Sequence, residues 1–168
     1  MLTFKTLAEL ADDAALVLES EFDYGPTEFV RNSSHTDMDL IYLLYRHCWC
    51  DYFSDALYRI TGWPIVGASS KTTGDFHRLN RTNEGKLVDV TGYVTLDSLQ
   101  TTFDCTDLYL TENISRNKKT EALDDLEISM VTEALLHLHY EPFTALHSEI
   151  RNRLRTCQER FNCTSAKH

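Results

Sequence analysis

Three residues of this chain have the types and the order that nucleophilic catalysis by a thiol requires, namely Cys50, His77 and Asp89. A thiol becomes a useful nucleophile when a helix N-terminus and a nearby imidazolium stabilise its thiolate. An acid must then hold the imidazole in the productive tautomer. The set predicts a catalytic triad in which Cys50 attacks, His77 acts as base and acid, and Asp89 orients the imidazole ring.

Each of these side chains needs an element that brings it to a common site. The sequence predicts a helix that begins near Cys50 and stops at Gly62, because Pro64 prevents its continuation. The segments "DFHRLNR" and "GKLVDV" are rich in β-branched or apolar residues, and "NRTNEGK" predicts a hairpin connection between them. Pairing of the two strands would place His77 beside Asp89, and the helix would deliver Cys50 against them.

The stretch from 46 to 96 resembles the catalytic part of the transglutaminase-like and papain-like cysteine enzymes. In that superfamily a cysteine opens a helix that has a small residue one turn on. A Gly-x-Pro strand entry, a strand histidine, a Gly-Lys/Arg turn and a strand aspartate follow. The segments "CDYFSDALYRITGWPIVGA" and "DFHRLNRTNEGKLVDVTG" show this order. The matching residues are Cys50, Ser54, Gly62 with Pro64, His77, Gly85 with Lys86, and Asp89.

The resemblance implies a fold and a reaction. The implied fold is a small antiparallel sheet packed against a central helix that carries Cys50, with N- and C-terminal helices around this papain-like or transglutaminase-like core. The implied reaction breaks an amide or ester bond of a protein or peptide, by a thiol hydrolase, deamidase or acyl transferase that uses no cofactor. The chain also resembles small bacterial and phage domains with a "TGWP … H … GKxxDVTG" pattern.

The residues next to the nucleophile and the histidine depart from the family pattern. Arg78 follows the histidine, where such enzymes often have a small or aromatic residue. His47, Cys48 and Trp49 stand where the family often has Gly or Gln, so the backbone N–H of the nucleophile is the one obvious oxyanion donor. We expect the indoles of Trp49 and Trp63 to lie in the core or to form the oxyanion region or the cleft wall.

Cys48 is the alternative nucleophile. Tyr52 lies one turn after Cys48, whereas Ser54 lies one turn after Cys50. The smaller residue fits a crowded contact between a helix and a sheet, which favours Cys50.

A zinc site is the alternative to a reactive thiol. Five residues of zinc-ligand types lie close in sequence: His35, Asp37, His47, Cys48 and Cys50. A Cys-x-Cys pair lacks the usual two-residue gap, and no second pair matches it. We therefore expect no metal.

Asp89 has two possible orientations. Under strict strand alternation, Leu87, Asp89 and Thr91 share one face, which can be the solvent face. An acid between Val88 and Val90 would instead need a partner if it were buried.

Composition and charge restrict the class of protein. The chain has 168 residues, is 42% hydrophobic and carries a formal net charge of −10, which is typical of an acidic globular domain. This acidity argues against direct binding to nucleic acid, where lysine and arginine must replace counterions. Since no apolar run reaches about 18 residues and no signal sequence is evident, we expect no membrane segment and a cytoplasmic protein. Its five cysteines would then be mostly reduced.

The order of the elements predicts an α+β single domain over 1–168. Its expected parts are an N-terminal helical part (1–46), the catalytic-like helix and strands (47–112) and a C-terminal helical hairpin (117–163). Apolar periodicity predicts a helix over 3–20, and Thr36 is the expected N-cap of a short helix over "DMDLIYLLYRH". The segment "TTFDCTDLYL" has the composition of a further strand.

A different class of function also fits the composition. An acidic binding or inhibitor protein on the same fold would meet a basic protein partner through its negative surface, as a phage or bacterial anti-defence protein or effector would. The two functions differ in one test, because Cys50→Ala would leave the cellular effect of a binding protein intact.

Overall fold

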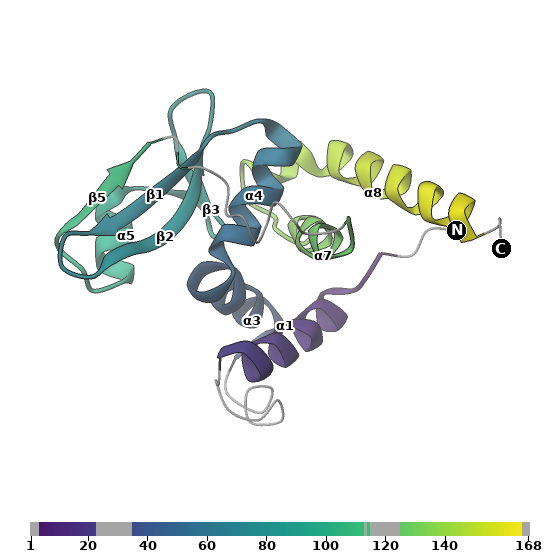
Figure 1. The fold of residues 1–168 in the computed structure, drawn as a ribbon, viewed down its shortest axis with the longest axis horizontal. Helices are drawn as coiled ribbons and strands as arrows, with labels where there is room; N and C mark the ends of the chain where they lie inside the picture. The colour runs from purple at the N-terminus through teal and green to yellow at the C-terminus, as the bar shows by residue number, and fades with distance from the viewer. Residues whose placement is uncertain (1–3, 23–34, 113, 115–124, 166–168) are drawn as a thin grey trace.

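The computed structural model of the protein describes residues 4–22, 35–112, 114 and 125–165. This part of the chain contains six α-helices, one π-helical segment and five strands. All strand pairs are antiparallel, and the helices gather mainly to one end of the sheet (Figure 1). The predicted α+β class is confirmed.

The sheet has the strand order β4-β3-β2-β1-β5. Its strands are β1 (Ile65–Ser70), β2 (Gly74–Arg81), β3 (Leu87–Asp89), β4 (Gly92–Val94) and β5 (Leu108–Thr111). The predicted hairpin is formed by β2 and β3, in which Asn80 pairs with Val88 and Arg81 with Leu87. Gly85 turns this hairpin with a φ of 83°, a conformation that a side chain disfavours.

A central helix, α4 (Cys50–Thr61), packs against β2. It ends as predicted, because Gly62 adopts the left-handed conformation at a φ of 74° and donates its N–H to the Tyr58 carbonyl. The Asn80 amide then fixes the helix to the strand by donating to the carbonyls of Ser54 and Trp63, each at 3.0 Å.

The segment before α4 contains a π-helix. The short helix α3 (Asp37–Leu43) begins at Thr36, whose side chain forms the capping box with Asp39. The chain then continues as η1 (Leu44–Cys48), a π-helical turn, where the sequence predicts an ordinary helix. Trp49 links η1 to α4 and donates its N–H to the Leu44 carbonyl at 2.6 Å. π-Helical turns are rare and frequently occur at functional sites.

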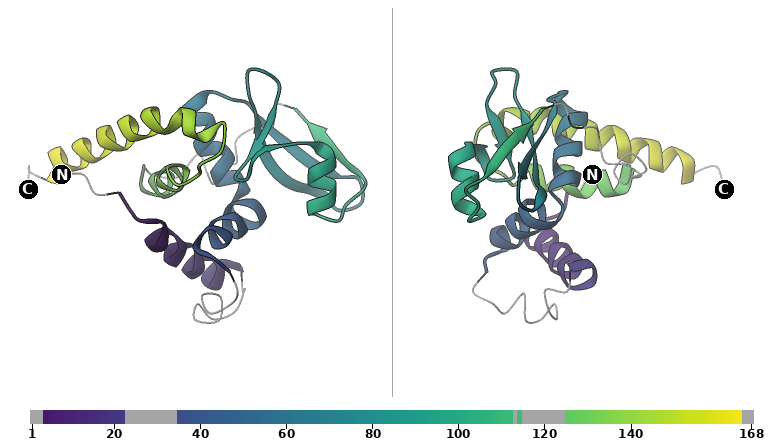
Figure 2. Two further views of the ribbon diagram at one scale, coloured as in Figure 1. Left: turned by 180° about the vertical axis from the view of Figure 1, so that it is seen from behind. Right: turned by 60° about the vertical axis from the view of Figure 1, so that its left-hand side comes forward.

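The sheet lies between two hydrophobic cores. α5 (Leu96–Thr102) covers one face with Leu99, in a cluster with Val66, Leu79 and Leu108. The other core surrounds α4 and includes residues of α1 (Leu7–Phe22), α7 (Asp125–Leu135) and α8 (Phe143–Ser165). Figure 2 shows α5 and α4 on opposite sides of the strands.

Two predicted elements differ from the structure. The helix expected over 3–20 begins at Leu7, after Thr6, which accepts from the Glu9 N–H as an N-cap residue does. The strand expected over 101–110 is shortened to β5, because α5 runs to Thr102. A capping box between Thr95 and Ser98 starts α5, and local capping therefore outweighs the β-branched composition.

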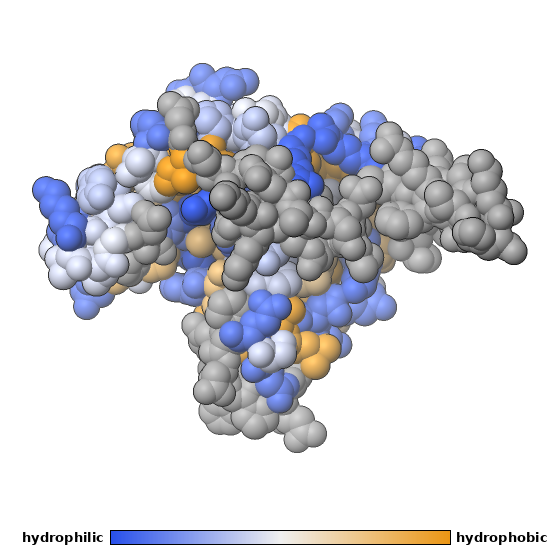
Figure 3. Space-filling view, in the orientation of Figure 1, coloured by the Kyte–Doolittle hydropathy of each residue, from blue (hydrophilic) through white to orange (hydrophobic). Residues whose placement is uncertain are grey.

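The described surface is mostly polar on the face that Figure 3 shows, with small apolar patches. Within the described residues, no helix combines the length and apolarity that a membrane crossing requires.

Candidate active site

Cys50 occupies the first position of α4 and is half-buried. The N–H groups of the first helical turn have no partner within the helix, so the Cys50 N–H is available to a ligand. The helix dipole places partial positive charge at this end, which favours an anionic sulfur. A cavity of about 250 Å³ opens beside Cys50, and its wall includes His47, Cys48, Asp51, His77 and Arg78.

β2 and β3 bring His77 and Asp89 together. His77 Nε2 lies 3.3 Å from Asp89 Oδ2, and the two side chains are 0% and 1% exposed. Asp89 therefore takes the buried one of the two orientations that the sequence left open. A β-bulge interrupts the β1–β2 ladder where His77 pairs with Ala68, and bulges re-aim the side chains beside them.

Asp89 has partners for both of its carboxylate oxygens. Oδ1 accepts hydrogen bonds from Thr91 N at 2.8 Å and from Thr91 Oγ1 at 2.6 Å. Oδ2 lies 3.1 Å from Arg46 Nε as well as beside the His77 ring. Burial acts to raise the pKa of Asp89, but the hydrogen bonds and charges of these partners outweigh burial and hold the pKa below its usual value. The carboxylate is therefore ionised at neutral pH.

The His77 ring is charged at neutral pH. Burial alone would lower its pKa, yet Asp89 and the adjacent Cys50 thiol together raise the pKa to about 9. Its two nitrogens have different surroundings, because Nε2 faces Asp89 whereas Nδ1 has no hydrogen-bond partner among the described residues. A buried, unpartnered ring nitrogen beside a thiol can exchange a proton with a molecule bound in the cavity.

Two further residues contact the groups of this site and were not indicated by the sequence, namely Phe103 and Arg46. The Phe103 ring contacts the rings of both His77 and His47, with centroids 5.2 and 5.3 Å apart. The Arg46 guanidinium lies 5.9 Å from the centre of the same ring, so Arg46 contacts both Phe103 and Asp89. Arg46 lies only four residues before Cys50, but its partners Asp89 and Phe103 are distant in the sequence, so no local pattern indicates these contacts.

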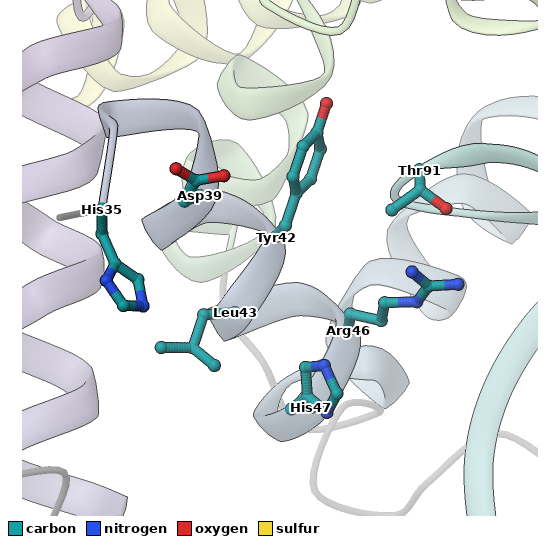
Figure 4. A pocket seen from close by; sticks show the side chains of 7 residues that line it. All are labelled: His35, Asp39, Tyr42, Leu43, Arg46, His47 and Thr91. Atoms are coloured by element: carbon teal, nitrogen blue, oxygen red, sulfur yellow. The ribbon is translucent and has the colours of Figure 1, made fainter. Parts of the chain in front are cut away.

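A second cavity, of about 350 Å³, lies on the Arg46 side of the site. Figure 4 shows Arg46 extending toward Thr91, with Tyr42 and His47 on the same helical stretch. His47 lines both this cavity and the cavity beside Cys50.

The two tryptophans lie away from this site. Trp49 is 7% exposed and belongs to the core around α4, where it stacks on Tyr52 and donates from Nε1 to Glu21. Trp63 is half-buried against the same core. The structure thus places both indoles in packing around α4, and neither is among the residues that line the cavity beside Cys50, which also include Gly67 and Ile114.

Cys48 lines the same cavity as Cys50, but it closes the π-helical turn and does not open a helix. Ser54, one turn after Cys50, is fully buried, which accords with the packing argument for Cys50. In the part of the chain that the structure describes, no group of three or more His, Cys, Asp or Glu residues is placed to hold a metal ion.

Comparisons of the chain with models of protein families, with curated proteins and with solved structures give no match.

Proposed function

We propose that this protein is a cysteine-nucleophile enzyme that acts on an amide or ester bond, on a core of the papain-like or transglutaminase-like kind. The single observation that supports this most is the state of the His77 ring. Asp89 holds its Nε2 edge, its Nδ1 atom has no partner among the described residues, and Cys50 adjoins it at a helix N-terminus.

The proposed reaction follows from these charges. The Cys50 thiolate attacks the carbonyl carbon and forms a C–S bond, while the carbonyl electrons move to the oxygen. The His77 imidazolium gives its proton to the leaving amine or alcohol as the tetrahedral intermediate collapses to an acyl-enzyme. His77, now neutral, takes a proton from water or an amine, whose attack on the acyl carbon expels the Cys50 thiolate. The products are those of hydrolysis, deamidation or acyl transfer.

The electrostatic cost of the site also supports a functional role. Burying Asp89 and a charged His77 is costly, and a structural ion pair needs no unpartnered nitrogen beside a cavity. A strongly shifted pKa beside a cavity, such as that of His77, is typical of a catalytic group. His77, whose pKa is raised, lies in one cavity wall with Cys50, the only described cysteine that opens a helix, and Asp89 lies behind the His77 ring as its buried partner.

Alkylation with iodoacetamide at pH 6 tests the proposal. We expect Cys50 to react at least tenfold faster than a model thiol, because an imidazolium and a helix N-terminus favour the thiolate. Mass spectrometry of digested protein would give the rate at each cysteine, with Cys48→Ser as the matched variant that keeps the proposed nucleophile.

His77→Gln should reduce the Cys50 rate to that of a model thiol, while circular dichroism monitors the fold. If Cys50 in the unmodified protein reacts no faster than a model thiol, the proposed mechanism is wrong.

A non-catalytic acidic binding protein is the second candidate, and the net charge of −10 favours it. It predicts that Cys50→Ala preserves capture of a basic protein partner and any cellular effect. Loss of the effect with an unchanged fold would favour the enzyme.

A further inference from the structure

His47 is the one side chain that lines the cavities on both sides of the site, among the residues that the structure describes. It lies three residues before Cys50, in the π-helical segment η1. Its ring contacts Phe103 edge-on, and Phe103 in turn contacts His77. Cys50 and His77 border the cavity from α4 and β2, so His47 borders the same space from a third element.

The His47 ring is neutral at neutral pH. Partial burial lowers its pKa first, and the positive charges of Arg46 and His77 lower the pKa further than Asp89 raises it. A neutral imidazole carries one N–H donor and one acceptor. The two histidines of the cavity wall therefore differ, since His77 is a cation beside the thiol and His47 is a neutral donor.

Attack on a carbonyl creates a negatively charged oxygen that needs preorganised donors. The Cys50 backbone N–H is one donor, and a second is needed from a side chain in the cavity wall. Asp51 is an acceptor that would repel the oxygen, and Cys48 is a weak donor. Arg78 already has interactions within the protein. Among the described residues, the His47 ring makes no hydrogen bond.

We propose that the His47 ring N–H and the Cys50 backbone N–H together bind the oxyanion that forms when Cys50 attacks a carbonyl carbon. This inference rests on the proposed function and adds a catalytic residue to it. His47 then serves as the side-chain oxyanion donor, a role that neither Cys48 nor Trp49 fills. Being neutral, it binds the developing charge without supplying a second cation that would compete with His77 for the thiolate.

Two reactions of the same thiol separate this role from thiolate activation. Iodoacetamide reacts by displacement of iodide at a CH₂ carbon and develops no oxyanion. p-Nitrophenyl acetate is attacked at its carbonyl carbon, passes through an oxyanion and releases p-nitrophenolate as the acetyl group joins sulfur. Both rates are measured on the full chain carrying Cys48→Ser, and mass spectrometry locates the product on Cys50.

We expect His47→Ala to slow acetylation about 100-fold, as loss of one oxyanion donor does, and to leave alkylation within twofold. His47→Gln, which restores an N–H donor, should recover at least tenfold of the lost acetylation rate. His47 is exposed, so both variants should fold, and circular dichroism checks this.

Equal slowing of both reactions would mean that His47 acts on the thiolate, and unchanged acetylation would mean that it binds no oxyanion; either result overturns the inference. If the chain that keeps His47 is alkylated fast at Cys50 but is not acetylated, the inference is also overturned, while the conclusion that Cys50 is an activated thiol is kept. Slow alkylation of Cys50 in the unmodified protein contradicts the proposed function itself.

Discussion

The two ends of α4 show how the same helix serves two purposes. At its C-terminal end, Arg153 donates to the carbonyls of Arg59 and Ile60, at 2.7 and 3.1 Å, and Gly62 ends the helix. At its N-terminal end, Cys50 borders a cavity and the adjacent His77 has an unpartnered Nδ1. The carbonyls at the C-terminal end, called the closed end here, accept hydrogen bonds from the protein, whereas His77 Nδ1 beside the N-terminal end, called the open end here, remains available to a ligand.

Each end also has a buried aspartate that pairs with an arginine. Asp55 is 0% exposed and lies 3.0 Å from Arg59 Nε, and Asp89 is 1% exposed and lies 3.1 Å from Arg46 Nε. The Asp55 pair is a local contact between residues four apart on one helix. The Asp89 pair joins η1 to β3 and also holds His77. Burial of a carboxylate therefore does not mark the candidate site, but its link to a histidine beside a cavity does.

The largest expected effect is that of Asp89→Asn, which removes the charge that Arg46 and His77 share. Leaving the buried His77 and the half-buried Arg46 without their partner should lower the free energy of unfolding by about 3 kcal/mol or more. The loss of the partner of Nε2 should also abolish the fast alkylation of Cys50. Chemical denaturation and alkylation at pH 6 measure the two effects.

Asp55→Asn is the matched control for this comparison. We expect it to destabilise the protein by about 1–3 kcal/mol, because it also breaks a buried pair, while Cys50 keeps its reactivity. Equal loss of reactivity in both variants would show that the two ends of α4 do not differ as described.

The stability of the protein should depend on pH through His77. Its pKa is about 9 in the folded state, above the ordinary value of 6.5, so its contribution is complete below pH 6.5. The contribution is lost as pH rises through about 9 and amounts to about 3 kcal/mol. Asp89 works in the opposite direction, because its lowered pKa gives stability that is lost as pH falls below its ordinary value of 3.8.

Urea unfolding at pH 6 and pH 9.5 tests this dependence. His77→Gln should remove most of the difference between the two values, since it removes the titrating group. A difference that persists in this variant would assign the pH dependence to other groups.

The smallest expected effect belongs to the closed end. Arg153→Met removes the two bonds to the α4 carbonyls from an exposed side chain, and we expect a loss of about 1 kcal/mol in the free energy of unfolding. Cys50 alkylation should not change. Glu149→Gln, which removes only the exposed partner of Arg153, should cost less than about 0.5 kcal/mol. A lower alkylation rate of Cys50 in Arg153→Met would mean that contacts at the closed end also affect the geometry of the site.

Much of the local structure around the site could be predicted from the sequence. The stop of α4 at Gly62 and the turn at Gly85 follow from short-range signals, whereas no side-chain cap marks the start of α4 at Cys50. The capping box at Thr36 is likewise local. α5 was missed although its Thr95 cap is also local, because the β-branched composition of the following residues indicated a strand.

Taken alone, the sequence determined the α+β class, the helix that Cys50 opens and the hairpin that carries His77 and Asp89. These features depend on caps, turns and apolar periodicity within a few residues. Only the tertiary structure decided that Asp89 is buried, that Arg46 pairs with it and that His47 borders the cavity of Cys50. Such contacts join η1, β2 and β3, and the π-helical turn and β-bulge that aim the side chains arise from packing, which no local pattern encodes.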